Sequence, residues 1–173
     1  MRTVIGASLI DSFYPVREDV RKFFAAGAAI EYDRKFLKEG IVSTDLFVLT
    51  AEFLKNLAYG NRPAEPLLLK FMLDALRLSG YGINAECCYK CGAIPEGRVY
   101  FDHASGGFLC EDCKEDRGRE IRLSTFNAVK KAAAGEELEE KEALPPLKLI
   151  DHYITLKADE TIKALKELIK MSN

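Results

Sequence analysis

The sequence predicts a mainly α-helical fold, a helical bundle interrupted by a short turn-rich module that carries four cysteines. Apolar residues recur every three to four positions over most of the 173 residues, which is the period of one buried helical face. Between residues 83 and 120 this period vanishes, and glycines and prolines separate short extended stretches. We therefore expect four segments: 1–12, a strand or linker; 13–82, the first part of the helical core; 83–120, the insert; and 121–173, the rest of the core.

Composition and charge are those of an ordinary soluble globular protein. Apolar residues make up 48% and charged residues 30% of the chain. The 25 basic and 27 acidic residues leave a net charge of −2, so no global field attracts a polyanion. No apolar run approaches membrane-spanning length, and the N-terminus lacks the pattern of a secretion signal. We therefore expect a cytoplasmic protein.

Three helices are expected before the insert. The first covers residues 15–38, the second runs from a cap at Ser43 to just before Gly60, and the third runs from near Pro66 to Gly80. The loops between them are short, which favours an antiparallel bundle. The buried stripe of the first helix is expected at Val16, Val20, Phe23, Phe24, Gly27 and Ile30.

Two helices are expected after the insert. The first runs from a cap at Ser124 to Gly135, and a charged, solvated connector follows it. The Pro-Pro pair at 145–146 opens the final helix, which reaches Lys170. The apolar stripe of this helix is interrupted over residues 157–160, where we expect a kink or a break.

Four cysteines form two C-x-x-C pairs, Cys88 with Cys91 and Cys110 with Cys113, with eighteen residues between the pairs. Each pair makes a tight turn that aims two sulfurs at one ion, and a hairpin between them brings the two turns together. Four thiolates complete the tetrahedral shell of Zn²⁺ and leave no open position for water or substrate. The spacing therefore predicts one structural zinc ion in a ribbon-like module. Cys87 is left as a spare thiol.

Other interpretations of the cysteines stay open. They include buried free thiols, a thiol oxidoreductase that uses one C-x-x-C pair, and an iron–sulfur cluster on the same ligands. The rest of the sequence contains no catalytic motif. The chain has only two histidines, His103 and His152, and neither accompanies a nucleophile or a phosphate-binding loop. We therefore expect a protein that is not an enzyme.

A zinc ribbon also suggests direct DNA binding, but the local charge argues against a simple version of it. From residue 86 to residue 122 the sequence has six basic and eight acidic residues, a net charge of −2. Only Arg117, Arg119 and Arg122 cluster, either as a small DNA-contacting patch or as a solvated segment that leads into a helix. A zinc-ribbon regulator that binds DNA remains the alternative.

Three stretches of the chain resemble the bacterial recombination mediator RecO. ASLIDSFYPVREDVRKFFAAGAAIE, residues 7–31, looks like the approach to that family's first long helix. LLLKFMLDALRLSGYGINAECCYKCG, residues 67–92, is similar to its helix, Gly-Tyr-Gly turn and first cysteine pair. FDHASGGFLCEDC, residues 101–113, resembles its second cysteine pair after a Gly-Gly hairpin.

The departure from the family is at the N-terminus, where RecO proteins begin with an OB-fold barrel that this chain lacks. Residues 2–10 alternate loosely and predict a short strand, yet no nearby stretch could pair with it. The resemblance makes residues 1–12 the remnant or link of a missing barrel. The chain is then either a fragment or a naturally shortened relative.

The resemblance implies a non-catalytic function. RecO-like proteins help load the recombinase onto single strands coated by single-stranded-DNA-binding protein, pair with RecR, and anneal complementary strands, with much of the DNA contact made by the barrel. Their helical domain receives the acidic C-terminal tail of single-stranded-DNA-binding protein in an apolar pocket flanked by basic residues. Lys70, Phe71 and Arg77 match that region here. The alternative is that Lys70 and Arg77 are ordinary solvent-facing residues on a core helix.

Overall fold

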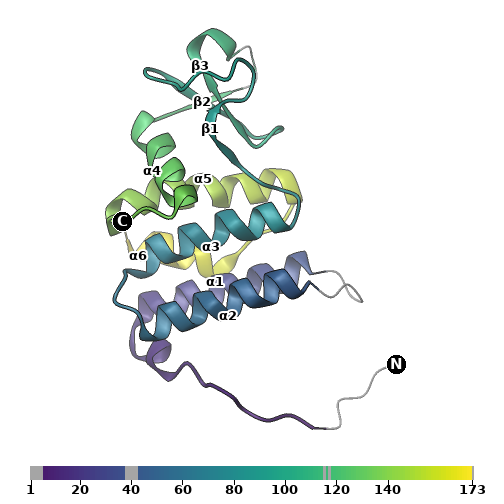
Figure 1. Ribbon diagram of the computed structural model, residues 1–173, viewed down its shortest axis with the longest axis vertical. Helices are drawn as coiled ribbons and strands as arrows, with labels where there is room; N and C mark the ends of the chain where they lie inside the picture. The colour runs from purple at the N-terminus through teal and green to yellow at the C-terminus, as the bar shows by residue number, and fades with distance from the viewer. Residues whose placement is uncertain (1–5, 38–42, 115, 117, 173) are drawn as a thin grey trace.

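The computed structural model describes residues 6–37, 43–114, 116 and 118–172. Within these residues the chain forms six α-helices, two short 3₁₀ helices and a four-stranded sheet that lies at one end of the molecule (Figure 1). The expected mainly α-helical fold is confirmed. In chain order the elements are η1 (Tyr14–Glu18), α1 (Val20–Phe36), α2 (Thr44–Tyr59), α3 (Ala64–Leu78), β1 (Asn84–Cys88), β2 (Val99–Asp102), β3 (Gly107–Cys110), η2 (Glu111–Cys113), β4 (Arg119–Ile121), α4 (Leu123–Ala134), α5 (Glu140–Ala158) and α6 (Lys163–Met171).

The helical body consists of α1 to α6. The side chain of Asp19 caps α1, and the Ser43 hydroxyl accepts a hydrogen bond from the backbone N–H of Leu46 at the start of α2. The first three helices pack against one another, as the short loops predict, while α6 lies along α1 and α5 packs on α3 and α4. These helices share one main apolar core.

The first helix differs from its prediction in both its start and its buried face. Pro15 lies in the 3₁₀ turn η1, and α1 begins only after Asp19, whose extended backbone separates the two. Val20, Phe23 and Ile30 are 54%, 55% and 49% exposed, so the expected stripe is wrong at these positions. The buried residues of α1 are instead Ala25, Ala26, Ala28, Ala29 and Tyr32.

Close helix packing explains this difference. Small side chains allow two helices to approach, and a Cβ atom at Gly27 would lie 3.2 Å from the Cβ of Ala164 in α6. The contact with α6 therefore favours small residues in α1, although the large ring of Tyr32 is also fully buried. Val20, Phe23 and Ile30 remain exposed.

The final helix also starts earlier than predicted. Glu139 and Glu142 form a reciprocal capping box, so α5 begins at Glu140 within the segment expected to be a connector. Pro145 and Pro146 therefore lie inside α5, near its start, where only two carbonyl groups lose their helical partners. The expected break is confirmed, because Asp159 adopts the left-handed conformation, with φ 52°, and separates α5 from α6.

Two smaller predictions are also corrected. Arg122, and not Ser124, occupies the N-cap position of α4. Residues 6–10 form no strand and are exposed, while residues 2–5 of the predicted strand lie outside the described residues. The boundaries of the four predicted segments remain predictions.

The sheet has the strand order β1-β3-β2-β4. Strands β2 and β3 form the expected antiparallel hairpin, with Tyr100 opposite Leu109. The strand β1 lies parallel to β3 at one edge, and β4 lies antiparallel to β2 at the other edge. We call β1 to β4, with their connections, the cysteine module. The chain enters this module along one edge of the sheet and leaves it along the other.

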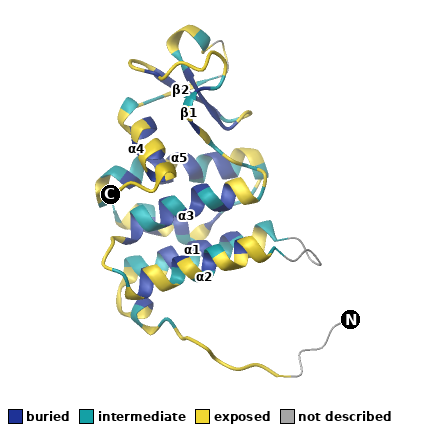
Figure 2. Ribbon diagram, in the orientation of Figure 1, coloured by how far each residue is buried: buried dark blue, intermediate teal, exposed yellow. Residues whose placement is uncertain are grey.

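The cysteine module has its own small core beside the main one. Figure 2 shows buried residues both in the strands of the module and in the helices. Its buried members are Cys88, Tyr100 and Leu109. Phe101 and Phe108 instead belong to the main core, where their rings contact those of Tyr153 in α5 and Phe126 in α4. The sheet is therefore anchored to the helical body by aromatic residues from its central hairpin.

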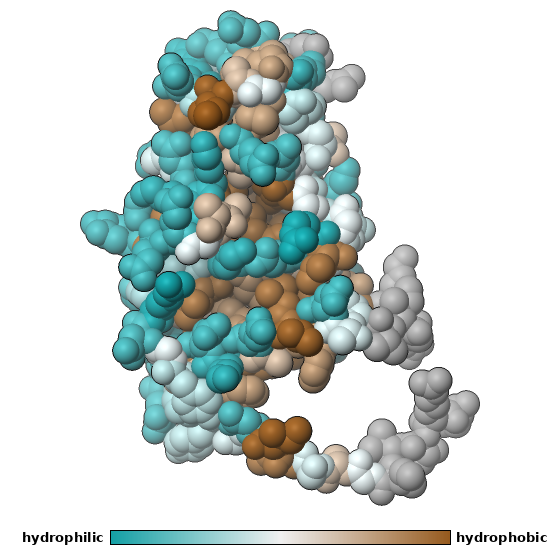
Figure 3. Space-filling view, viewed as in Figure 1, coloured by the Kyte–Doolittle hydropathy of each residue, from teal (hydrophilic) through white to brown (hydrophobic). Residues whose placement is uncertain are grey.

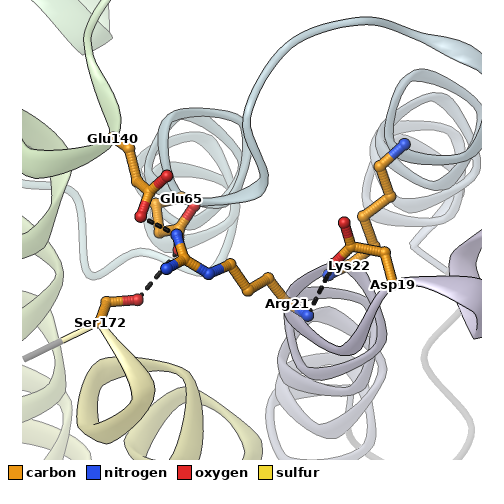
Figure 4. Close-up of polar contacts among 6 residues, drawn as sticks. All are labelled: Asp19, Arg21, Lys22, Glu65, Glu140 and Ser172. Atoms are coloured by element: carbon orange, nitrogen blue, oxygen red, sulfur yellow. Dashed lines mark hydrogen bonds and ion pairs between the residues drawn. The ribbon is translucent and has the colours of Figure 1, made fainter.

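A polar cluster joins the ends of four helices (Figure 4). Glu65, in the first turn of α3, is only 1% exposed, and its Oε1 accepts hydrogen bonds from Arg21 Nη1 at 3.3 Å and Ser172 Oγ at 3.0 Å. Arg21 also pairs with Glu140 at the start of α5. The buried carboxylate thus has compensating partners from α1 and from the end of α6. The cluster fixes how these helix ends meet.

Candidate metal centre and docking groove

The sulfur atoms of Cys88, Cys91, Cys110 and Cys113 all lie within 4.8 Å of one another. The Cys91 and Cys110 sulfurs are 3.7 Å apart. A tetrahedral zinc shell with Zn–S bonds of about 2.3 Å places its sulfurs about 3.8 Å apart. The four thiols therefore form a cluster of the size that one such ion requires. Cys87 is not part of this cluster.

Local backbone geometry creates the first half of the cluster. Strand β1 ends at Cys88, whose carbonyl accepts a hydrogen bond from the N–H of Gly92 at 2.8 Å, while its own N–H donates to the carbonyl of Ala93 at 2.8 Å. Gly92 has φ 75°, a conformation that glycine adopts without a steric penalty. The turn therefore folds Cys91 back beside Cys88.

The second half of the cluster follows β3. Cys110 is the last residue of that strand, and the 3₁₀ turn η2 places Cys113 beside it. Because β1 and β3 are parallel neighbours, their ends lie side by side and the two cysteine turns meet. The pairing of β1 with β3 thus brings together the two cysteine pairs, which eighteen residues separate in the sequence.

The pKa values of the clustered thiols shift in different directions. Burial raises the pKa of Cys88, but hydrogen bonds from the backbone N–H groups of Cys91, Cys110 and Lys90 outweigh burial and lower it to about 6. Hydrogen bonding with the Cys110 and Cys91 side chains raises the pKa of Cys113 to about 12, and burial raises the pKa of Cys110. Without a cation, Cys88 is thus the most acidic of these three thiols. A bound dication stabilises every thiolate.

The surroundings of the cluster are those of a small structural core. Tyr100 and Leu109 are buried against Cys88, and the ammonium group of Lys114 lies 4.8 Å from the centre of the Tyr100 ring. A redox C-x-x-C pair of the thioredoxin type opens an α-helix after a strand, whereas these two pairs end in a turn and in a three-residue 3₁₀ helix. The local structure therefore favours metal binding over dithiol redox chemistry.

A pocket of about 530 Å³ lies between α2, α3 and the segment that joins α4 to α5. We call it the docking groove. Phe71 contributes to its apolar lining and Lys70 lies on α3 beside it; Figure 3 shows apolar surface between polar side chains on the face of the molecule that carries α2 and α3. Its apolar side chains include Leu49, Phe53, Leu67, Phe71 and Leu138.

Arg77 lies elsewhere. It lines a second groove, of about 490 Å³, between α3, the start of β1 and the end of α4. The structure therefore brings Lys70 and Phe71 together in one groove and places Arg77 in the neighbouring one. Asp74 lines both grooves, and its carboxylate is 2.7 Å from Lys70 Nζ and 3.8 Å from Arg77 Nη2.

The three arginines of the predicted DNA patch are described only in part. Arg119 lies on edge strand β4 and Arg122 at the N-cap of α4, and both are exposed, while Arg117 lies outside the described residues. Nearby, Arg98 is within 3.7 Å of Glu111 and 3.9 Å of Glu120. Two acidic residues of the module therefore lie beside one of its cations, and DNA contact by Arg117, Arg119 and Arg122 remains a prediction.

The two histidines meet where the module packs on α5. The ring centroids of His103 and His152 are 4.8 Å apart, and the buried Nε2 atom of His103 has no hydrogen-bond partner among the described residues. Burial, His152 and Arg119 lower the pKa of His103, which favours its neutral form. The two rings therefore lie within the packing contact between the module and α5.

Comparison with known proteins gives a consistent result. Residues 17–166 match the family described as Recombination protein O C terminal. The chain belongs to the RecO family. It is 34% identical over 121 residues to the DNA repair protein RecO of Anaeromyxobacter sp. (strain K), which covers 69% of this chain and 47% of that relative. The RecO protein of Caldicellulosiruptor bescii is 28% identical over 127 residues, covering 73% of this chain and 52% of the relative.

The chain spans about half the length of the curated RecO relatives it matches. The matched half is the C-terminal part of the family, as the resemblance of the helices and cysteine pairs implied. Among the described helices, none is both long enough and apolar enough to span a bilayer.

One residue that lines both grooves was not predicted from the sequence. Asp74 received no role, although its spacing of four from Lys70 and three from Arg77 brings all three side chains to neighbouring positions on a helix. That spacing was the available signal. What the sequence could not provide was the position of Asp74 between two grooves.

Proposed function

We propose that this chain is the non-catalytic C-terminal part of a RecO-type recombination mediator, a module that docks partner proteins to help recombinase loading and strand annealing. Family membership supports a function in DNA repair and recombination. The observation that supports partner docking is the groove that combines Phe71 with Lys70. An apolar lining beside a cation suits a peptide that ends in an apolar residue and carries carboxylates. The acidic tail of single-stranded-DNA-binding protein has this chemistry.

The same proposal includes one structural Zn²⁺ bound by Cys88, Cys91, Cys110 and Cys113. The sulfur separations and the lack of a further ligand position in a four-thiolate shell support it. When bound, the ion supplies cross-links between the two cysteine turns and no chemistry. A RecR-like partner, DNA contact made mainly through a barrel, and a cytoplasmic location that keeps the thiols reduced complete the proposal.

Peptide titration tests the docking function. A fluorescently labelled peptide of the acidic tail is expected to bind the wild-type chain, and the double variant Lys70→Glu with Arg77→Glu is expected to lose at least about tenfold in affinity, because two attractive contacts become repulsive. The exposed Lys163→Glu on α6 is a matched control, since it changes charge away from both grooves. Equal affinity of the double variant and the control would contradict the proposal.

DNA binding is the competing function. If the chain acts as a DNA-binding regulator, a labelled single strand or duplex binds it without a partner, binding weakens steeply with salt, and the change of Arg119 and Arg122 to Glu abolishes it. We expect no such binding by the chain alone, since acidic residues outnumber basic ones from residue 86 to residue 122. Fluorescence anisotropy at two salt concentrations distinguishes the two functions.

A further inference from the structure

Asp74 lines both the docking groove and the second groove. Its Oδ2 atom lies 2.7 Å from Lys70 Nζ and its Oδ1 atom 3.8 Å from Arg77 Nη2, so one oxygen of the carboxylate faces each cation. These are the two cations proposed to receive the carboxylates of an acidic peptide. In the free protein, both are already paired with the same internal anion.

We propose that Asp74 is an internal competitor for the acidic ligand, a residue that takes the place of the ligand's carboxylate until the ligand displaces it. This inference rests on the proposed docking function and adds to it a control of affinity. A carboxylate that enters the groove meets Lys70 only by exchanging with Asp74, or by sharing the ammonium group with it. Asp74 therefore lowers the affinity and selects for ligands with several carboxylates.

The geometry makes this exchange feasible. The side chain of Lys70 is 40% exposed and that of Arg77 70% exposed, so water and a ligand both reach the cations. An exposed pair four residues apart on a helix contributes little, and the order with lysine before the acid is the weaker one. The side chain of Asp74 is 23% exposed, so it reaches solvent once Lys70 turns away. Displacement of Asp74 from these exposed cations therefore costs little.

The rest of the groove distinguishes competition from simple repulsion. Glu52, Glu136 and Glu137 also line it, and Arg62 is held by Glu137 at 3.3 Å. These carboxylates repel an acidic ligand without occupying Lys70. Removal of Glu52 therefore relieves repulsion alone, whereas removal of Asp74 relieves repulsion and frees the cations.

The experiment compares Asp74→Asn with the control Glu52→Gln, since both remove one negative charge from the lining of the same groove. With the labelled acidic tail peptide we expect about a fivefold gain in affinity for Asp74→Asn and less than about a twofold gain for Glu52→Gln. The gain should shrink at high salt and be absent for the same peptide with its carboxylates replaced by amides. Asp74→Ala repeats the test without a hydrogen-bonding side chain.

A double-mutant cycle makes the inference specific. In a chain that carries Lys70→Gln and Arg77→Gln, the further change Asp74→Asn is expected to raise affinity no more than Glu52→Gln does, because it relieves repulsion and neither Lys70 nor Arg77 is left to free. Wild-type binding with no gain in Asp74→Asn and Asp74→Ala would overturn the competitor role and leave the docking function intact. Absence of peptide binding by the wild type and by both variants would overturn both.

Discussion

The helical body and the cysteine module are stabilised in different ways. The body buries dozens of apolar side chains in one core that reaches from α1 to α6. The module buries three residues of its own, Cys88, Tyr100 and Leu109, and borrows further anchoring from Phe101 and Phe108 in the main core. The body is held by apolar burial, whereas the module has a much smaller core of its own and is expected to depend on the proposed metal cross-link. A small sheet beside a large core can thus carry a separate dependence on metal and on thiol chemistry.

The largest expected effect is on the module alone. Cys110→Ser, or treatment with a strong chelator, should abolish zinc binding. The module should then unfold, because a structural zinc site contributes about 10–16 kcal/mol of binding free energy to the fold that it holds. Amide resonances of the module should lose their dispersion, while far-ultraviolet circular dichroism retains most of the helical signal. Metal analysis and NMR spectra of the same sample provide the measurement.

Cys87→Ser is the matched control for this prediction. Cys87 neighbours Cys88 in β1 but lies outside the thiol cluster, so its replacement should leave zinc stoichiometry near one and the spectrum unchanged. If the amide resonances of the module stayed dispersed in the metal-free chain, the sheet would need no cross-link. The proposed difference in stabilisation between module and body would then be wrong.

A smaller effect is expected on the body alone. Leu76, in α3, is fully buried in the main core, and Leu76→Ala should lower the free energy of unfolding by about 2–5 kcal/mol through lost contacts and a cavity. Urea denaturation followed by circular dichroism measures it. Zinc stoichiometry of the native variant should stay near one.

Leu78→Ala provides the control on the same helix. This leucine is 38% exposed, so the change should cost less than about 1 kcal/mol. If Leu76→Ala released zinc from a still folded body, the two regions would not be independent in the way that their separate cores suggest.

The smallest effect concerns the contact between the two regions. Burial, together with His152 and Arg119, lowers the pKa of His103 below its usual value of 6.5, and only Asp102 opposes this. Lys157 of α5 adds a further positive charge nearby, since its ammonium group donates to the carbonyl of Ala104. The neutral ring is favoured in the folded state, so this contribution is complete above about pH 6.5 and is lost as the pH falls toward the lowered pKa.

His103→Gln should remove that part of the pH dependence. Between pH 7.5 and 5.5 the wild type should lose up to about 1 kcal/mol more in free energy of unfolding than the variant does. Urea denaturation of both chains at each pH, with zinc present, gives the difference. Identical pH dependence in the two chains would show that protonation of His103 does not change the free energy of unfolding.

How far the sequence predicts the structure depends on whether the signal is local. The helices α2 and α3 lie close to their predicted limits because Ser43, Gly60 and Gly80 are local signals, and the C-x-x-C spacing likewise predicted which thiols come together. The parallel pairing of β1 with β3 was not predicted, because pairing between strands separated by another strand leaves no periodic mark in the sequence.

The failures in α1 and α5 have tertiary and electrostatic causes. In α1 the predicted stripe residues Val20, Phe23 and Ile30 are exposed, because the close contact with α6 at Gly27 favours small side chains on the buried face. In α5 the pair of prolines was a stronger start signal than the acidic residues before it, yet Glu139 and Glu142 form the actual cap. The position of Asp74 between two grooves depends on α2, β1 and α4, and no local pattern contains it.

The attachment of the cysteine module at both edges of its sheet has a mechanical consequence. Strand β1 follows α3 and β4 precedes α4, and these same two helices contribute Lys70 and Ala132 to the walls of the docking groove. A sheet that is connected to both helices restricts how far these two walls can move apart. If the four thiols bind zinc as proposed, release of the metal is expected to weaken this restraint without changing any residue that lines the groove.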